Sequence, residues 1–353
     1  MEFFHICFDL IFEILTRVPL KSIDRFKSVS KNWQSLMYNS FFLSVSCQRT
    51  NTFLGCIIQR QARHDMKSTF ISMDQSQVYM NLSLEFLPRP FKIEASSSQG
   101  LLCCVTGGRR PRFGVCKPST RQWQPIPNPK MRHFTDKVAI IVLRSDPLRY
   151  KIVRLSWPKH SLINYCKFPC EVFDSDRWTW RQLDDILLPA RVLLAPGHGV
   201  VSGTTVYWLL TNNQVLEFDC NTGTYTVFGL PASVYLEKDE FRFWSKKLIE
   251  YEGRLGFVCK DEVDRSWLLW VRKNYEWGKQ KQFIAELVED KEPLSSLVAF
   301  CGTDVAIFQG VCGVFFYWFQ SSSLSEVKIP GLWLARREVF PFRSDLEPVE
   351  LRQ

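Results

Sequence analysis

The sequence has no long hydrophobic run, no regular cysteine spacing and few histidines. The longest apolar run, residues 311–319, contains Gly313 and is far too short to cross a bilayer. The N-terminal residues include Glu2 and Asp9 and lack a basic segment, so we expect no signal peptide. The 12 cysteines do not follow the spacings of a secreted disulfide scaffold. Most lie in apolar runs, which predicts free buried thiols and a reducing location: cytoplasm, nucleus or both.

Motifs that would indicate catalysis or metal binding are also lacking. The 5 histidines are scattered singly, and no HExxH, P-loop or nucleophile-elbow pattern occurs. Residues 197–203 nearly match a dinucleotide-binding loop, but a strand and not a helix is expected to follow, which favours a turn. Cys166 and Cys170 have a spacing seen in metal sites but no second pair. We therefore expect no catalytic residue, metal or cofactor, although a large β domain could assemble a site from distant residues.

Acidic residues are missing from one long basic stretch. The 353 residues carry a net charge of +9, and residues 109–132 contain Lys and Arg but no Asp or Glu. Such a run is usually a solvated face; the alternatives are a surface for an acidic protein and, last, one for nucleic acid. Arginines form forked contacts with carboxylates, so Arg109, Arg110 and Arg112 are candidates for binding an acidic segment of another protein.

Aromatic residues, in contrast, are abundant. They make up 14% of the chain, and 18 prolines and 17 glycines punctuate the sequence. Aromatic segments between turn residues favour β strands. The length is too great for one compact core and suits a small module joined to one large β architecture.

Helical periodicity is clear only in residues 1–45. Pro19 ends the first predicted helix, and Ser22 and Ser30 are candidate N-caps of a second and a third. Three short helices cannot bury their apolar surface among themselves, so the apolar stripe packs on the chain's second domain or contacts a partner. The stripe of the first helix contains Leu10, Ile11, Ile14, Leu15 and Val18.

Residues 8–33, FDLIFEILTRVPLKSIDRFKSVSKNW, resemble the F-box in its plant form. The departures are Ile6-Cys7, where the family has Leu-Pro, and Asn39-Ser40, where it often has Asp-Pro. The resemblance implies that the helices bind the Skp-type adaptor of cullin-RING ubiquitin ligases while the rest of the chain captures a substrate. The adaptor-facing candidates that it implies are Leu10, Ile11, Ile14, Leu15, Pro19, Leu20, Ile23, Phe26, Val29 and Trp33.

The remaining sequence repeats one pattern: an apolar strand, a second strand, then a turn followed by an aromatic residue. It occurs in residues 100–127, 151–180 and 206–231, at a spacing of about 40–50 residues that is typical of four-stranded propeller blades. We expect about six units, with the aromatic residue packed across the blade interface. Residues 51–95 are expected to supply the first blade, and residues 339–342 a closing strand.

The pattern of residues 100–127 resembles the F-box-associated domain of plants, a kelch-like region, and weaker matches extend to about residue 330. The prediction is therefore a multidomain α + all-β protein, with a three-helix F-box in residues 1–45 and a kelch-like β-propeller-type domain in residues 46–353. The resemblance implies a non-catalytic substrate-recognition subunit of an SCF-type ubiquitin ligase, joined by the adaptor to a cullin scaffold. Neither a membrane nor nucleic acid is expected as a partner.

Two alternatives remain open from the sequence. One is a kelch-like propeller enzyme with an accessory helical N-terminus. The other is an F-box protein that acts outside an active ligase. Adaptor binding separates the first alternative from the ligase receptor, because an enzyme has no need of that partner.

Overall fold

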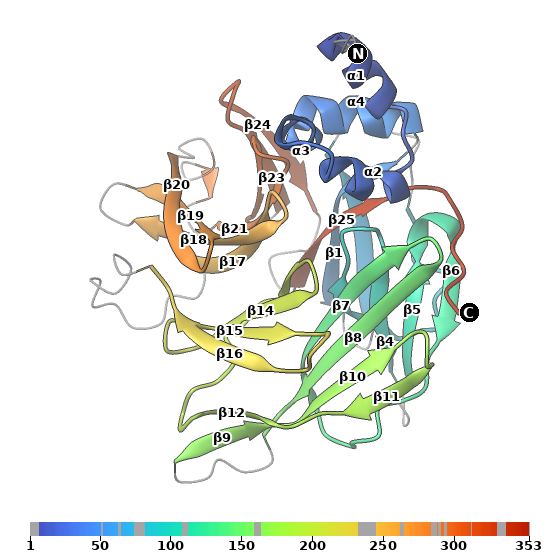
Figure 1. The fold of residues 1–353 in the computed structure, drawn as a ribbon, viewed down its shortest axis with the longest axis vertical. Coiled ribbons are helices and arrows are strands. Elements are labelled where there is room, and N and C mark those ends of the chain that lie inside the picture. Colours follow the sequence, from blue (N-terminus) through green and yellow to red (C-terminus); the bar gives the residue numbers. More distant parts are fainter. Residues whose placement is uncertain are drawn as a thin grey trace, which may run out of the picture.

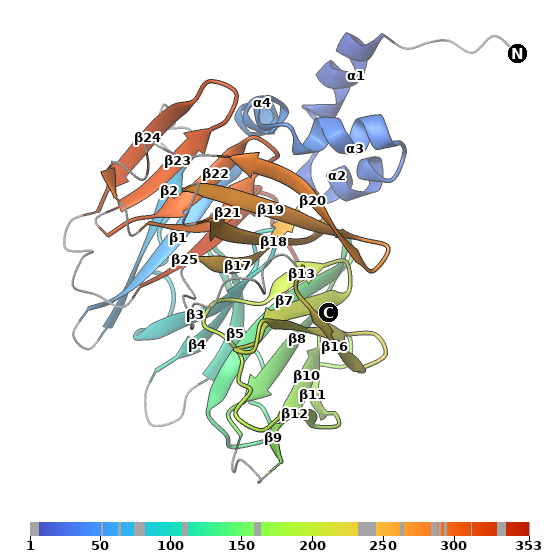
Figure 2. The same cartoon turned by 90° about the vertical axis from the view of Figure 1, so that its left-hand side faces the viewer.

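Four short helices precede the strands along the chain. They are α1 (Phe8–Leu15), α2 (Leu20–Lys27), α3 (Lys31–Tyr38) and α4 (Ser40–Thr50). The computed structural model describes residues 7–50, 52–62, 65–73, 82–107, 112–158, 164–231, 245–261, 265–283, 288, 291–292, 295–311, 313–329 and 337–352. The strands form a six-bladed β-propeller, and the helices lie together at one end of it (Figures 1 and 2). The sequence predicted about six blades correctly, but it predicted three helices at the N-terminal end, where residues 7–50 form four.

Five blades are four-stranded antiparallel sheets that follow one another along the chain. Blade I contains β3 (Phe91–Ser96), β4 (Leu102–Thr106), β5 (Arg112–Lys117) and β6 (Gln122–Pro125), and blade II contains β7 (Thr135–Ser145), β8 (Leu148–Ser156), β10 (Cys170–Asp174) and β11 (Thr179–Gln182). Blade III contains β13 (Val200–Ser202), β14 (Thr205–Leu209), β15 (Gln214–Asp219) and β16 (Tyr225–Gly229). Blade IV contains β17 (Lys246–Tyr251), β18 (Arg254–Asp261), β19 (Ser266–Lys273) and β20 (Glu276–Phe283). Blade V contains β21 (Ser296–Cys301), β22 (Val305–Gln309), β23 (Gly313–Trp318) and β24 (Ser323–Lys328).

Blade VI joins segments from the two ends of the propeller sequence. Its strand order is β2 (Asp65–Ser72), β1 (Phe53–Ala62) and β25 (Arg337–Ser344), with β25 innermost. A separate two-stranded ribbon, β9 (Tyr165–Phe168) with β12 (Ile186–Pro189), extends blade II. The closing strand predicted at residues 339–342 is confirmed, because β25 pairs with β1. The assignment of residues 51–95 to the first blade is wrong: β1 and β2 complete the last blade, and only β3 belongs to blade I.

The alternation of side chains along β1 explains how blade VI joins its two neighbours. Cys56 and Ile58 pack into the core shared with blade V, whereas Ile57 packs into the core shared with blade I. Successive side chains of a strand point to opposite faces, so one strand serves both interfaces. The ladder runs from Phe53 opposite Ser344 to Arg60 opposite Arg337, so that both edges of β1 are paired.

The aromatic residues after the blade turns link neighbouring blades, as predicted. Trp180 donates from Nε1 to the carbonyl oxygen of Pro127 in the segment after blade I at 2.6 Å, and the Tyr225 hydroxyl accepts from the backbone N–H of Leu187 at 3.0 Å. Trp277 likewise donates to the carbonyl of Gly229 in blade III. In each case a group of the preceding blade or of the segment that follows it satisfies the polar atom of the aromatic side chain.

The propeller has two faces, which we name from the helices. The helix face carries the turns between the first and second strands of the blades, including residues 302–304, which contact the chain between α3 and α4. The far face is the opposite one, where the innermost strands β3, β7, β13, β17, β21 and β25 begin. Strand β4 ends on the far face and β5 begins there, because β4 runs antiparallel to β3 and β5 antiparallel to β4.

Buried thiols account for most of the described cysteines. Eleven are free, and all of them except Cys7 are buried. Burial raises the pKa of Cys220 to about 12, so this thiol stays protonated near neutral pH. Within the described ranges, no helix has both the length and the apolar character needed to cross a bilayer.

Closure of the ring can be tested at Phe342 on β25. Its ring is buried and meets Phe70 of β2 edge-to-face, with ring centroids 5.9 Å apart. Phe342→Ala should lower the free energy of unfolding by about 3–5 kcal/mol, since it leaves a cavity in the closing blade. Denaturant unfolding measures this loss. Phe134→Ala is the control, because Phe134 is 85% exposed and should change stability by less than about 0.5 kcal/mol. Equal losses in the two variants would contradict the role of Phe342 in closure.

Candidate adaptor-binding surface

Local capping sets where the helices begin. The predicted cap at Ser30 is confirmed, because its hydroxyl accepts from the backbone N–H of Trp33 at 3.2 Å. The cap predicted at Ser22 is wrong: α2 begins after Pro19, and Ser22 lies within its first turn. The unpredicted helix α4 follows Asn39, whose side-chain oxygen accepts from the N–H of Phe42 at 3.1 Å. An asparagine three residues before a hydrophobic position is the signal that could have revealed α4.

The helices share a small apolar core, and three of the residues predicted to face the adaptor are buried in it. Leu15, Leu20 and Ile23 are buried there together with Met37 and Phe42. Their burial assigns them to holding the helices together. The sequence could not separate this role from partner binding, because all lie in the same apolar pattern.

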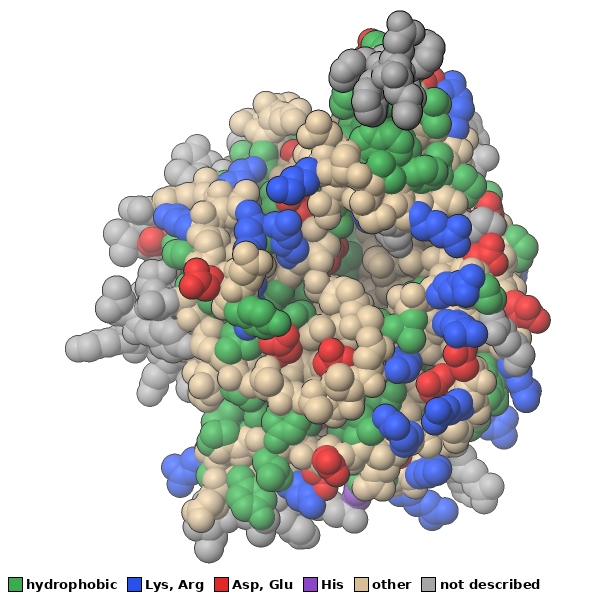
Figure 3. Space-filling view, in the orientation of Figure 1, with side chains coloured by type: hydrophobic (Ala, Val, Ile, Leu, Met, Phe, Trp, Pro, Cys, Tyr) green, Lys and Arg blue, Asp and Glu red, His purple; other side chains and the backbone are tan. Residues whose placement is uncertain are grey.

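The other predicted residues reach the surface of the helical unit. Leu10, Ile14, Pro19 and Val29 are exposed, whereas Ile11, Phe26 and Trp33 are partly buried. Ile14 is 59% exposed, whereas its neighbour Leu15 is only 1% exposed. Adjacent residues of α1 therefore differ: Ile14 is accessible to a partner, and Leu15 packs inside the helical core. Figure 3 shows hydrophobic side chains gathered over the helices. We call the exposed set the apolar helix surface; it contains Leu10, Ile14, Pro19 and Val29, and also Phe8 and Phe41, which the sequence did not single out.

The junction between α3 and α4 is fixed to the helix face of the propeller. Asp304 in the β21–β22 turn accepts from the backbone N–H of Ser40 at 3.0 Å and from the Ser40 hydroxyl. The N–H of Thr303 donates to the carbonyl of Tyr38 at 2.9 Å. Gly302 permits this approach, because a Cβ there would lie 2.5 Å from the Tyr38 carbonyl oxygen.

Helix α4 belongs to both parts of the protein. Phe42 is buried in the helical core, whereas Leu43 and Cys47 pack with strands of blades V and VI. The boundary predicted between residues 45 and 46 therefore falls inside α4, on both sides of which side chains pack into the propeller core. Removal of residues 1–45 would expose that core.

An ion-pair network joins α1 to α4. The Glu13 carboxylate contacts Arg49 at 2.9 Å and also Arg17, and Arg49 donates to the Thr16 hydroxyl. The hydrogen bonds from Arg49 and Arg17 lower the pKa of Glu13 to about 2. Because the folded pKa is depressed, this interaction stabilises the helices above about pH 4.5 and is lost as the pH falls through about 2.

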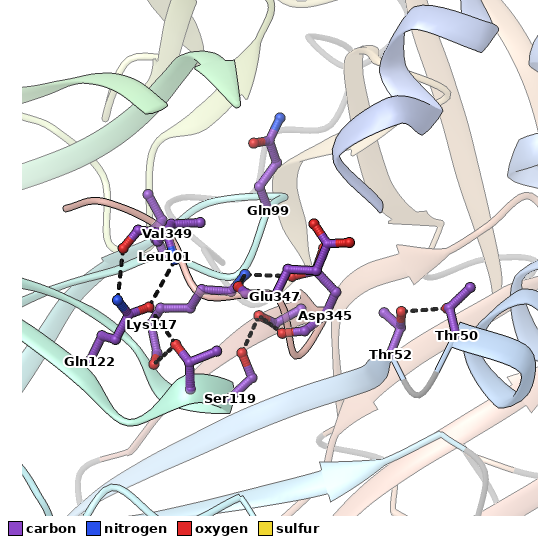
Figure 4. A network of polar contacts seen from close by, with 12 residues as sticks. Thr50, Thr52, Gln99, Leu101, Lys117, Ser119, Gln122, Asp345, Glu347 and Val349 are labelled. Carbon is purple, nitrogen blue, oxygen red and sulfur yellow. Dashed lines mark hydrogen bonds and ion pairs between the residues drawn. The ribbon is translucent and has the colours of Figure 1, made fainter. Parts of the chain in front are cut away.

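The C-terminal segment after β25, residues 345–352, crosses the helix face over blades I and II (Figures 1 and 4). Lys117 of β5 is buried and contacts both the Asp345 carboxylate and the carbonyl of Glu347. The Gln122 side chain donates to and accepts from the backbone of Val349, at 2.7 and 3.0 Å. The segment is therefore held by side chains of blade I.

A cavity of about 160 Å³ lies where the helices, the blades and the C-terminal segment meet. Leu20 of α2, the turn between β7 and β8, and the segment from Asp345 to Glu350 line it, together with Lys117. Leu20 thus packs at the boundary between the helical core and the propeller.

The structure divides the predicted basic stretch. Arg109 and Arg110 lie outside the described residues; Arg112 is exposed at the start of β5 on the far face. The prediction that the whole basic stretch is solvated is wrong at Lys117, because this side chain is buried against Asp345.

Of the residues described, no group of three or more His, Cys, Asp or Glu side chains is arranged to hold a metal ion.

An N-terminal helical unit with an exposed apolar surface, fixed to one face of a six-bladed propeller, defines the class of protein. Residues 3–45 match the F-box domain, and residues 45–333 match the F-box associated beta propeller domain. The chain therefore belongs to the family of plant F-box proteins with an F-box-associated propeller.

Relatives from Arabidopsis thaliana support this assignment. F-box protein At5g49610 is 28% identical over 76% of this chain and 75% of its own length. F-box protein At5g41720 is 35% identical over 42% of this chain and 85% of its own length, and F-box protein At3g49450 is 23% identical over 97% and 91%. Among solved structures, TolB from Acinetobacter baumannii has a TM-score of 0.45 at 9% identity, with 82% of this chain and 66% of that chain covered.

The attachment of the helices can be tested at Asp304. Asp304→Ala leaves the buried N–H of Ser40 without its acceptor, which should lower the free energy of unfolding by about 1–3 kcal/mol. Hydrogen exchange at the Ser40 amide should accelerate in the same variant. Asp304→Asn keeps one side-chain acceptor and is the matched control, so it should lose less stability and protection. If Asp304→Ala left both measurements unchanged, the contact would have no part in attachment.

The buried pair of Lys117 and Asp345 gives a second test. Lys117→Met should destabilise the protein by about 3–5 kcal/mol, because it leaves a buried carboxylate without its partner. The double variant Lys117→Met/Asp345→Leu should recover most of that loss, since neither charge then remains buried. Thermal unfolding of the wild type, both single variants and the double variant measures the coupling. Additive losses would show that the two side chains act independently.

Proposed function

We propose that this protein is the substrate-recognition subunit of an SCF-type ubiquitin ligase. The apolar helix surface binds the Skp-type adaptor, and the adaptor connects the chain to a cullin-RING scaffold. The propeller holds a target protein, which is then ubiquitinated by an enzyme that other subunits supply. The chain itself is non-catalytic in this proposal and contributes by proximity.

The observation that carries the proposal is the exposure of Leu10, Ile14 and Val29 on a helical unit that is otherwise well packed. Large apolar side chains that stay exposed beside a formed core indicate a protein interface. The contacts of Asp304 with Ser40 support a fixed orientation of the helices, which would keep a captured target at a defined distance from the adaptor.

The far face is the proposed site of target binding, since the helices and the C-terminal segment occupy the other face. Arg112, which is exposed at the start of β5 on the far face, is proposed to contact an acidic segment of the target together with Arg109 and Arg110, which lie outside the described residues. We also propose that the blades are kelch-like. The proposed location of the protein is the cytoplasm, the nucleus or both. The alternatives are a propeller enzyme and an F-box protein outside an active ligase.

Adaptor binding can be tested at Ile14. Ile14→Ala should weaken binding of a Skp-type adaptor by about 1–2 kcal/mol, because the residue supplies exposed apolar area to the interface. Leu15→Ala should instead lower stability by about 2–5 kcal/mol, because Leu15 is buried in the helical core. Calorimetric titration and thermal unfolding of both variants separate the two roles.

Leu187→Ala is the control, since Leu187 is exposed on the propeller far from the helices in sequence and fold. It should leave adaptor affinity unchanged. If Leu10→Asp/Ile14→Asp bound the adaptor as the wild type does, the proposal would be wrong. If the wild type bound the adaptor but recovered no cullin on co-precipitation, a role outside an active ligase would be favoured.

A further inference from the structure

Two exposed aromatic residues stand opposite each other where blade II meets the far face. Phe134 is 85% exposed and Trp157 is 50% exposed. They lie one position beyond the β7–β8 ladder, which begins with Thr135 opposite Ser156, and the N–H of Trp157 donates to the carbonyl of Phe134 at 2.9 Å. The start of β7 and the end of β8 point away from the helices (Figure 1). Opposed residues of an antiparallel pair direct their side chains to the same side, so both rings are presented together.

A buried ion pair holds the segment that leads to Phe134. The Arg154 guanidinium of β8 and the Glu171 carboxylate of β10 lie 2.6 Å apart, and both side chains are almost completely buried. Arg154 also donates to the carbonyls of Met131 and His133. Glu171 accepts from the N–H of Met131 at 3.0 Å. The pair is therefore bound to the backbone of this irregular segment and fixes its path.

The fixed backbone determines which side chains face solvent. Lys130, Arg132 and Phe134 are exposed, whereas Met131 and His133, whose carbonyls accept from the ion pair, are half-buried. An aromatic side chain on an ordered backbone has little freedom left to lose when a partner binds. The segment thus presents a pre-ordered apolar anchor with cations beside it.

The cations next to the aromatic pair have no counter-charge. Among the described residues, neither Lys130 nor Arg132 has an ion-pair partner, and Arg112 at the start of β5 has none either. Arg112 adjoins the same segment, because the N–H of Phe113 donates to the side-chain oxygen of Asn128 at 3.4 Å. Three basic side chains are therefore free to contact a partner.

The nearby carboxylates are engaged elsewhere. Residues 109–135 contain no Asp or Glu. Glu171 is buried in its own ion pair, and Asp136, the next acidic residue along the chain, is partly buried and interacts electrostatically with Lys137. The exposed surface around the aromatic pair is consequently apolar and basic, which complements a partner that is apolar and acidic.

We propose that the aromatic pair and the adjoining cations form a docking surface for a short acidic protein segment that carries a large apolar side chain. The members of this docking surface are Phe134, Trp157, Lys130, Arg132 and Arg112. The apolar side chain packs on the rings, and the carboxylates contact the cations. A single-stranded nucleic acid would need a basic groove with rings for successive bases, whereas this surface offers one aromatic pair.

The inference rests on the proposed function, because it names the kind of target segment that blade II holds. Methyl nuclear magnetic resonance of the full chain with ¹³C-labelled methionine tests it. The chain has 6 methionines, and Met131 lies inside the docking segment, where Met131→Leu identifies its signal.

The probe is the capped peptide acetyl-Glu-Asp-Leu-Phe-Glu-Asp-amide. A saturable shift of the Met131 signal is expected. A peptide with two serines in place of its Leu-Phe should bind roughly tenfold more weakly, because it lacks the apolar anchor. A peptide with lysines in place of its acidic residues should produce no shift, because like charges repel.

Variants at exposed positions separate the contributions. Phe134→Ala should weaken binding of the acidic peptide by about tenfold, since it removes the anchor. Tyr275→Ala is the matched control, because Tyr275 is as exposed as Phe134 but lies on the turn between β19 and β20 in blade IV, and it should leave affinity unchanged. Arg132→Ser should weaken binding and reduce its dependence on salt.

A Met131 signal that responds to none of the peptides, or to the serine peptide as strongly as to the first, would overturn the proposal. Wild-type affinity in Phe134→Ala would also overturn it. Tighter binding of a short oligothymidylate than of the acidic peptide would assign the surface to nucleic acid instead. The peptide results need no adaptor, and adaptor co-precipitation should be equal in all variants, so failure here is distinguishable from failure of the proposed function.

Discussion

The pairing of β1 with β25 is the constraint on which the rest of the structure depends. It closes the ring and leaves no unpaired edge on β1. The chain enters β1 directly from α4 and leaves β25 into the C-terminal segment, so the pairing brings both attached segments to the same face. It also places Glu338, at the start of β25, beside Lys92 on the far face.

The two faces of the propeller therefore differ in which parts of the chain contact them. The helix face is largely taken by contacts within the chain: Asp304 holds the α3–α4 junction, and Lys117 and Gln122 hold the C-terminal segment. The far face carries the starts of the innermost strands, where Lys92 contacts Glu94 and Glu338. In the proposed function, an adaptor on the apolar helix surface and a target on the far face would approach from opposite sides of the propeller.

The sequence predicted features that depend on neighbouring residues. The blade pattern and the cap at Ser30 follow from turn residues, strand alternation and hydrogen bonding within a few positions, whereas the closing strand was predicted because closure removes an unpaired sheet edge. The helix α4 was missed because Phe42 and Leu43 pack into two different cores, which removes the single apolar stripe that marks an amphipathic helix.

Features formed by distant residues were harder to predict. Lys117 appeared to belong to a solvated basic run because its partner Asp345 lies at the other end of the propeller sequence. The contact between Lys92 and Glu338 was not predicted either, since these residues are far apart in sequence and meet only in the closed ring. Among the residues predicted to face the adaptor, the apolar stripe could be recognised from the sequence, but the separation of exposed Ile14 from buried Leu15 could not.

Ring closure also orders events during translation. Strand β1 leaves the ribosome before five whole blades have been made, whereas its partner β25 and the anchoring Asp304 come much later. The nascent chain therefore carries complete F-box helices next to a β1 strand whose inner edge is still open. Such an edge can pair with other chains, so translation that stops before β25 yields a product that retains the apolar helix surface and is prone to aggregation.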